Sequence, residues 1–189
     1  MIVSYFGDGT FRLQNGETSV LIDSQNNRLK ADVYLKTLAT PEIPSSENEI
    51  FAAGEYELKG VEVQGWELND ESGDKFIKTV YLIRWEDIKI AALGHVSGAI
   101  SGDILDHLSD ADILILPAGG GNFLTAEAAA KLAKQLEPAI VIPSFIKDGK
   151  DFLKAIGQKA ETEEKFVFKK KDLVPGAIRA VVLAANSEK

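Results

Sequence analysis

The chain has few side chains that bind transition metals strongly, and His95 is the most site-like of them. There are two histidines and no cysteine, so disulfides, thiolate zinc sites and cysteine nucleophiles are impossible. His95 follows an apolar run that ends in Leu93-Gly94, whereas His107 lies in a predicted short helix and is expected to be exposed. A single histidine at the start of a loop suits either a functional site or an ordinary hydrogen bond, so both interpretations stay open.

Carboxylates could complete a metal site around His95. Asp8, Asp23 and Glu42 are the candidates, and with His95 they would form a carboxylate-rich site for manganese, magnesium or iron. Asp8 stands in a predicted turn and Asp23 ends a predicted strand, so both are equally suited to capping the backbone. The sequence therefore leaves metal binding and turn formation as alternatives for these carboxylates.

The run Ile113-Leu114-Ile115-Leu116 is the clearest element that could position such a site. Its four aliphatic residues, stopped by Pro117, predict a strand buried on both faces, and Gly119, Gly120 and Gly121 follow it. The glycine amides could hold an anion at the start of the next helix. No Lys-Ser or Lys-Thr pair follows as in a P-loop, so a tight turn beside a site is the favoured interpretation.

The first half of the chain reads as a series of short strands. Asn15-Gly16 and Lys59-Gly60 each separate two alternating runs and predict hairpins. Strands are expected at 2–6, 11–13, 19–22, 33–35, 79–85 and 88–93, and the hairpin around Lys59-Gly60 is expected within 51–66.

The second half alternates helices with strands. Ser101 and Thr125 are the predicted caps of two helices, and Gly157 is expected to end a third. Strands are expected at 113–116, at 139–142 with Pro143 as its stop, at 166–168 and at 178–183. This order predicts an α/β (α+β) fold with mixed sheets and helices on the outside.

Composition narrows the classes of function. The 189 residues, 45% hydrophobic and 26% charged, suit one globular domain spanning 1–189. A net charge of −8 disfavours nucleic acid as a partner, and the cluster 169–171 is expected to be a solvated strand end. No run approaches a membrane span and no signal peptide is visible, so we expect no membrane partner and a cytoplasmic location.

Several motifs together resemble the metallo-β-lactamase fold, and within it a small bacterial subfamily of Zn-dependent hydrolases. The resemblance extends over nearly the whole chain and depends on three segments. They are the opening Tyr5-Phe6-Gly7 with Leu21-Ile22-Asp23, the hairpin Gly54-Glu55-Tyr56-Glu57 with Lys59-Gly60-Val61, and the strand 110–121 with its glycines. The resemblance implies a four-layered αββα sandwich, with two mixed sheets between outer helices.

The family's chemistry depends on an H-x-H-x-D-H loop and later His, Asp and His ligands, which hold two metal ions and a bridging water. The resemblance places Leu38, Thr40 and Ile43 at the three histidine positions of that loop and Glu42 at its aspartate. His95 stands where the later aspartate is expected. Phe145 stands at the last histidine, and the middle histidine has no counterpart.

Because two histidines cannot build a family-type site, we expect a degenerate member without a cofactor, a pseudoenzyme that binds an unknown small molecule or protein through a vestigial cleft. The alternative is a metal-dependent hydrolase of phosphodiesters, esters or lactones, with zinc or another divalent ion held by an altered ligand set around His95 and Glu42. The sequence does not indicate the oligomeric state.

Overall fold

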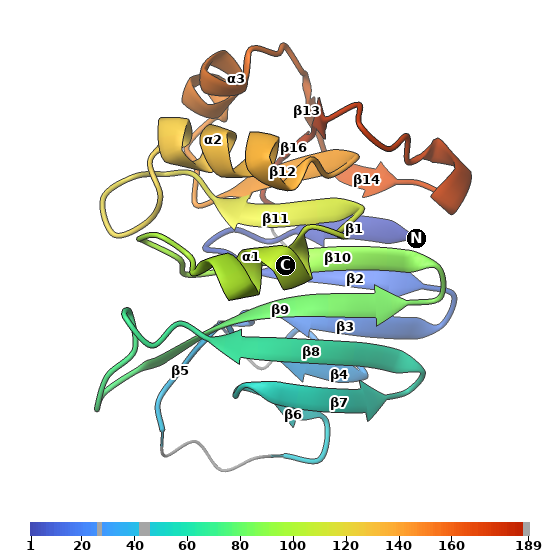
Figure 1. Ribbon diagram of the computed structural model, residues 1–189. Helices are drawn as coiled ribbons and strands as arrows, with labels where there is room; N and C mark the ends of the chain where they lie inside the picture. Colours follow the sequence, from blue (N-terminus) through green and yellow to red (C-terminus); the bar gives the residue numbers. More distant parts are fainter. Residues whose placement is uncertain (26–27, 42–45, 187–189) are drawn as a thin grey trace.

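Two mixed β-sheets pack face to face in this computed structural model, which describes residues 1–25, 28–41 and 46–186 (Figure 1). The six-stranded sheet contains, in spatial order, β14 (Lys165–Val167), β1 (Ile2–Tyr5), β2 (Phe11–Asn15), β3 (Thr18–Ile22), β4 (Val33–Leu35) and β6 (Glu49–Ile50). The eight-stranded sheet contains β15 (Arg179–Ala180), β12 (Ile140–Ser144), β11 (Ile113–Pro117), β10 (Ile88–Ala92), β9 (Ile77–Trp85), β8 (Val61–Glu67) and β7 (Gly54–Leu58), with β5 (Leu38–Ala39) beside β9. Two short strands, β13 (Thr162–Glu163) and β16 (Val182–Leu183), pair separately.

The main core lies between the two sheets, where alternate residues of each strand point inward. Val3, Leu13 and Val33 of the first sheet meet Ile83, Ile90 and Ile142 of the second, and all are fully buried. The predicted sandwich of the metallo-β-lactamase type, with two mixed sheets, is confirmed.

The helices form a second core on the outer face of the eight-stranded sheet. They are α1 (Gly102–Leu108), α2 (Ala126–Leu136) and α3 (Lys150–Ile156), with a 3₁₀ turn η1 (Lys170–Asp172) near the end of the chain. Leu108, Ala129, Ala133 and Phe152 pack against Leu82 and Leu114 of that sheet. Among the described residues no α-helix covers the outer face of the six-stranded sheet, so the helical layer is one-sided.

The locally determined elements follow the predictions. The turns at Asn15-Gly16 and Lys59-Gly60 connect antiparallel strands, and Thr125 caps α2 by accepting a hydrogen bond from the amide of Ala128. Gly157 ends α3 in the left-handed conformation. Ser101 stands at the start of α1 but makes no side-chain capping bond, so only its position was predicted correctly.

The predicted strand ends at Pro117 and Pro143 are wrong. Strand β12 continues through Pro143 to Ser144, and β11 includes Pro117. The amides of Arg179 and Val181 donate hydrogen bonds to the carbonyls of Ala139 and Val141. Pro143, two residues further along β12, faces the same side, but β15 has already ended there. The missing N–H of Pro143 therefore leaves no strand partner without a donor. The predicted strand 178–183 is divided into β15 and β16 because the chain changes partner from β12 to β13.

The direction of the strands brings distant loops to one edge of the sandwich. Strands β10, β11 and β12 are parallel, so the segments after them, which contain His95, Gly119 and Phe145, leave the sheet at the same end (left in Figure 1). In the other sheet β3 and β4 are also parallel, and Asp23 and Thr37 follow them.

No helix among the described residues is long and apolar enough to cross a membrane.

Candidate functional site

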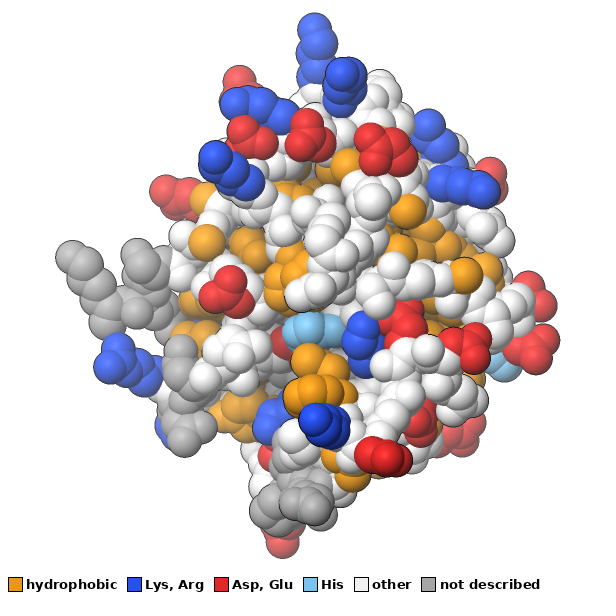
Figure 2. All heavy atoms as spheres, turned by 90° about the vertical axis from the view of Figure 1, so that its left-hand side faces the viewer, with side chains coloured by type: hydrophobic (Ala, Val, Ile, Leu, Met, Phe, Trp, Pro, Cys, Tyr) orange, Lys and Arg blue, Asp and Glu red, His pale blue; other side chains and the backbone are white. Residues whose placement is uncertain are grey.

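A cavity of about 240 Å³ opens at this edge, between the end of β3 and the loop after β10. Its lining residues come from both sheets: Asp23, Ser24, Gln25, Lys36, Leu38, Ala39, Thr40, Phe76 and His95. Figure 2 faces this edge and shows a histidine near the centre of the surface, with hydrophobic side chains above and below it and charged side chains beside it. The predicted site residues Asp23, Leu38, Thr40 and His95 are therefore brought together.

A chain of hydrogen bonds joins Asp23, Thr37 and His95 at the base of this cavity. The amide of Thr37 donates to Asp23 Oδ1 (2.7 Å), and its hydroxyl Oγ1 lies 2.6 Å from Asp23 Oδ2 and 2.8 Å from His95 Nδ1. The Asp23 carbonyl accepts a bond from the hydroxyl of Thr10. Both carboxylate oxygens of Asp23 are therefore occupied by protein donors.

Burial shifts the pKa values of the two ends of this chain in opposite directions. It raises the pKa of Asp23 to about 6, against smaller opposing effects of the Thr37 hydrogen bonds. Burial, with a smaller contribution from the Lys78 ammonium, lowers the pKa of His95 to about 4. Asp23 Oδ2 and His95 Nδ1 are 3.6 Å apart, yet they form no ion pair at neutral pH, because His95 is then uncharged.

Gly94 allows His95 and Thr37 to meet. A Cβ at Gly94 would lie 1.8 Å from Thr37 Oγ1, and its φ of 46° is in the left-handed region. The glycine before His95 is thus required by the close approach of two loops that are far apart in the sequence.

Aromatic side chains fill the space on the other side of His95. The ring of Phe145 lies 5.1 Å from the His95 ring and stacks on Phe123 at 4.0 Å. Phe145 has a positive φ of 53° and packs against Gly9 and Gly119, where added Cβ atoms would clash with its ring and its carbonyl. At the position that the resemblance assigns to a histidine ligand, a hydrocarbon ring therefore lies beside His95.

The glycine loop uses its backbone internally. The amide of Gly120 donates to the carbonyl of Leu124, and the amide of Phe123 donates to the carbonyl of Gly120. Gly120 and Gly121 have positive φ, whereas Gly119 is held against Phe145. These contacts support the interpretation of the glycines as a tight turn, because the Gly120 amide cannot also bind an anion.

The donors around the cavity do not suit a pair of metal ions. Among the described residues no group of three or more His, Asp or Glu side chains is placed to hold a metal ion. Leu38 has no donor atom, Thr40 offers a neutral hydroxyl, and Asp8 is exposed on the turn beside Gly9 and does not line the cavity. Glu42 and Ile43 lie outside the described residues.

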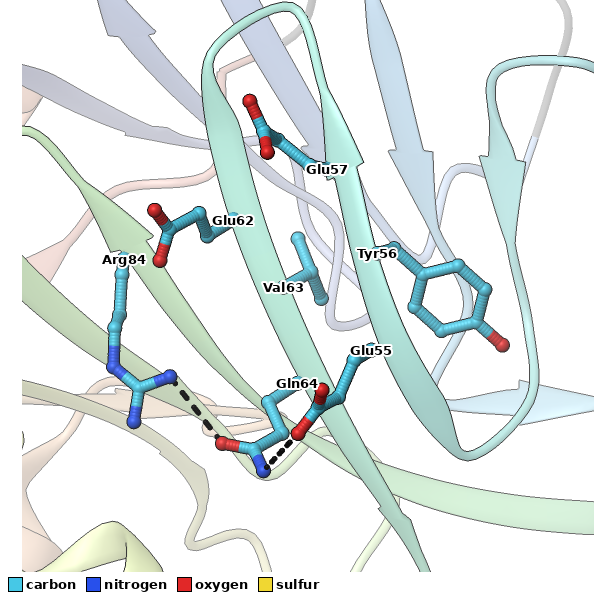
Figure 3. Close-up of a pocket in the computed structure, with 7 residues that line it drawn as sticks. All are labelled: Glu55, Tyr56, Glu57, Glu62, Val63, Gln64 and Arg84. Carbon is cyan, nitrogen blue, oxygen red and sulfur yellow. Dashed lines mark hydrogen bonds between the residues drawn. The ribbon is translucent and has the colours of Figure 1, made fainter.

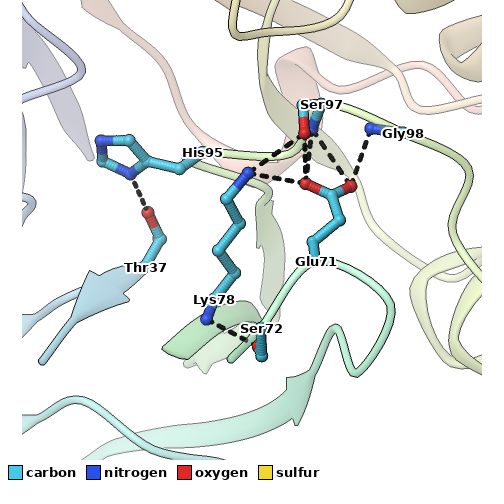
Figure 4. A network of polar contacts seen from close by, with 7 residues as sticks. All are labelled: Thr37, Glu71, Ser72, Lys78, His95, Ser97 and Gly98. Atoms are coloured by element: carbon cyan, nitrogen blue, oxygen red, sulfur yellow. Dashed lines mark hydrogen bonds and ion pairs between the residues drawn. The ribbon is translucent and has the colours of Figure 1, made fainter. Parts of the chain in front are cut away.

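A polar network holds the loop that carries His95 (Figure 4). The Glu71 carboxylate accepts hydrogen bonds from the amides of Ser97 and Gly98 and from the Ser97 hydroxyl, and it pairs with Lys78 at 2.7 Å. Burial alone would raise the pKa of Glu71, but these donors outweigh it and lower the pKa. Glu71 therefore ties the 68–76 loop to the loop after β10.

Replacing Glu71→Gln is expected to destabilise the protein by about 1–2 kcal/mol at pH 7, because charge-assisted hydrogen bonds to the loop after β10 are lost. Since the folded pKa is lowered, this stabilisation is present above the unfolded pKa of Glu71 and is lost as pH falls through the folded pKa. Urea unfolding at pH 7 measures it. The exposed pair Asp148–Lys150 is the control: Asp148→Asn should have no measurable effect, and an equal effect would contradict the role of Glu71.

A larger cavity, about 330 Å³, lies at the far end of the eight-stranded sheet (Figure 3). Gln64 there bridges Glu55 and Arg84, and Glu57 and Glu62 complete an acidic rim. The hydrogen bonds of Gln64 are exposed or only part-buried, whereas those of Asp23 with Thr37 are buried, so the smaller cavity at His95 is the better candidate.

Sequence reasoning missed Thr37, Lys78 and Phe123. Thr37 is buried (1% exposed) and connects Asp23 to His95. The residues next to it in the sequence form no motif that would indicate this role. The available signal was Gly94 directly before the candidate histidine, which indicates a close backbone approach.

Comparison with solved structures identifies this sandwich. A Thermotoga maritima protein described by assignment as a Zn-dependent hydrolase of the metallo-β-lactamase superfamily superposes with a TM-score of 0.76 at 21% identity, covering 96% of this chain and 97% of that chain. A metallo hydrolase from Ignicoccus hospitalis gives 0.65 at 17% identity, with coverages of 89% and 99%. The metallo-β-lactamase fold protein YhfI from Bacillus subtilis gives 0.64 at 8%, with coverages of 95% and 94%. At these identities the likeness shows the fold alone.

The sequence itself gives the family. No curated protein sequence matches the chain. The model of the family described as beta-lactamase superfamily domain, however, matches residues 2–144, well over half of the chain. The chain therefore belongs to the β-lactamase superfamily.

Proposed function

We propose that this protein keeps the superfamily fold without its dinuclear metal site and acts as a non-catalytic binding or scaffold protein through the remaining cleft. The main support for this proposal is the chemistry of the side chains near His95. Leu38 and Phe145 stand at positions that the resemblance assigns to histidine ligands, and neither has a donor.

The one buried carboxylate at the cleft supports the same proposal. Asp23 is buried and accepts the amide and the hydroxyl of Thr37, so a metal would compete with donors that are already in place. Among the described residues that line the cavity, His95 is the one strong ligand left, and a catalytic zinc site has three protein ligands. The related hydrolases are thus a guide to the fold of this chain and not to its chemistry.

The cleft retains features of a small binding site. The aromatic Phe76 at its edge is half exposed (50%), and Lys36 brings an ammonium group that also pairs with Glu49. A volume of about 240 Å³ is below the roughly 300–1,000 Å³ of sites for drug-sized ligands, so the occupant is a small molecule or one side chain of a protein partner. The cytoplasmic location stays a prediction.

The alternative is a hydrolase with a metal bound by His95 and Glu42. A turnover screen separates the two: the protein is assayed with generic esters, lactones and phosphodiesters in the presence of zinc, manganese or magnesium. We expect no turnover above that of a His95→Ala variant. Metal-dependent turnover that His95→Ala abolishes would contradict the proposal and establish the alternative.

A further inference from the structure

The outer nitrogen of His95, Nε2, has no hydrogen-bond partner among the residues that the structure describes. Nδ1 contacts Thr37, whereas no donor or acceptor among the described residues bonds to Nε2. Nε2 is also absent from the buried atoms that lack a partner, and His95 lines the cavity, so this nitrogen is accessible from the cleft. What Nε2 can bind depends on where the proton of the neutral ring resides.

The contacts of Thr37 decide the position of that proton. An ionised carboxylate only accepts hydrogen bonds, and a threonine hydroxyl has one hydrogen to donate. Because Asp23 Oδ2 lies 2.6 Å from Oγ1, the hydroxyl hydrogen is directed to Asp23. The 2.8 Å contact between Oγ1 and His95 Nδ1 must then be made by an N–H on Nδ1. Nε2 is left with a lone pair.

We infer that the Asp23–Thr37 pair fixes His95 as the Nδ1–H tautomer, so that Nε2 is a hydrogen-bond acceptor for a small molecule that carries an O–H or N–H group beside an apolar, planar part. This inference rests on the proposed function, because a bound metal would occupy the same nitrogen. It deepens the proposal by naming the class of ligand.

The surroundings of Nε2 agree with such a ligand. Leu38 and the half-exposed ring of Phe76 offer apolar contact within the same cavity. Lys78, whose ammonium group contributes to the lowered pKa of His95, is already bound to Glu71 and Ser97. A donor on the ligand would therefore meet an acceptor, and Leu38 and Phe76 would contact its apolar part, in a cavity that is also lined by the polar Ser24, Gln25, Lys36 and Thr40.

The tautomer can be measured directly. The chain has only two histidines, so a ¹⁵N–¹H correlation spectrum of the imidazoles at pH 7.5 contains two ring systems. The exposed His107, which stacks on Trp66 at 5.0 Å, is the internal reference. We expect the protonated nitrogen of His95 to be Nδ1. An Nε2–H ring would overturn the inference.

Two variants test the cause. In Asp23→Asn the side-chain amide can donate to Thr37, whose hydroxyl then donates to His95 Nδ1, so we expect the ring to switch to Nε2–H. Thr37→Val keeps the shape and removes the hydroxyl, and it should also release the Nδ1–H form. If His95 stays Nδ1–H in both folded variants, the inference is wrong.

Phenol and anisole, which differ by the O–H donor, test the ligand class. Phenol is expected to shift the His95 resonances and to bind about fivefold more tightly than anisole, corresponding to one hydrogen bond. The preference should disappear in Asp23→Asn. Equal binding of both probes by the unmodified protein would overturn the ligand class. Neither result bears on metal content, which is measured separately, so a failure here is distinguishable from failure of the proposed function.

Discussion

Gly119→Ala is expected to destabilise the protein by about 3 kcal/mol or more, one of the largest single effects in the chain. A Cβ at this position would lie 1.8 Å from the carbonyl oxygen of Phe145, which is a backbone atom and cannot rotate away. The amide of Ala118 also donates to the carbonyl of Ser144 at 3.0 Å, so the two loops cannot separate without losing a hydrogen bond.

The neighbouring Gly120→Ala is the matched control. Gly120 has a positive φ of 71°, but nothing lies within 4 Å of an added Cβ, so only the backbone conformation opposes the substitution. We expect a cost of about 1–2 kcal/mol. Urea unfolding of both variants measures the difference. Equal losses would contradict the claim that Gly119 is required by the position of Phe145.

Opposite pH dependences in Asp23 and His95 variants are the second large effect. Burial raises the pKa of Asp23 from 3.8 to about 6, so between these values the folded protein holds a proton that the unfolded chain has released. Stability therefore falls as pH rises through this window, by about 3 kcal/mol. Burial lowers the pKa of His95 from 6.5 to about 4, so here the unfolded chain holds the extra proton and stability rises with pH.

In the unmodified protein these two contributions largely offset each other between about pH 4 and 6.5. Asp23→Asn removes the Asp23 contribution, which falls as pH rises. The stability of this variant relative to the unmodified protein should therefore rise with pH, by about 3 kcal/mol in total. His95→Gln removes the His95 contribution, which rises with pH. The stability of this variant relative to the unmodified protein should therefore fall as pH rises, by a smaller amount, about 2 kcal/mol, because His95 is partly accessible to solvent. Urea unfolding at intervals from pH 4 to 7 measures both. Slopes of the same sign would show that the pKa shifts are wrong.

The parts of the fold that depend on local sequence were predictable, and the parts that depend on distant contacts were not. Asn15-Gly16 and Gly157 specify their turns through backbone conformation alone, and both predictions are confirmed. Pro143 was misread as a strand end because its tolerance depends on where the neighbouring β15 stops. A proline is compatible with a strand wherever its missing N–H faces no partner.

The candidate site shows the same division. His95 and Asp23 were singled out from their positions after predicted strands, and the structure places both at one cavity. Thr37, 58 residues before His95, could not be connected to it without the fold. The resemblance located Phe145 at a ligand position, and the structure adds that its ring packs beside His95 and Phe123.

The metal content of the purified protein tests the central claim most directly. The protein is produced in zinc-supplemented medium, purified without chelators, dialysed against metal-free buffer and analysed for bound metals, with a relative that contains the H-x-H-x-D-H motif treated identically. The account predicts that the relative retains its zinc and that this protein retains none. One or two zinc ions per chain would contradict it.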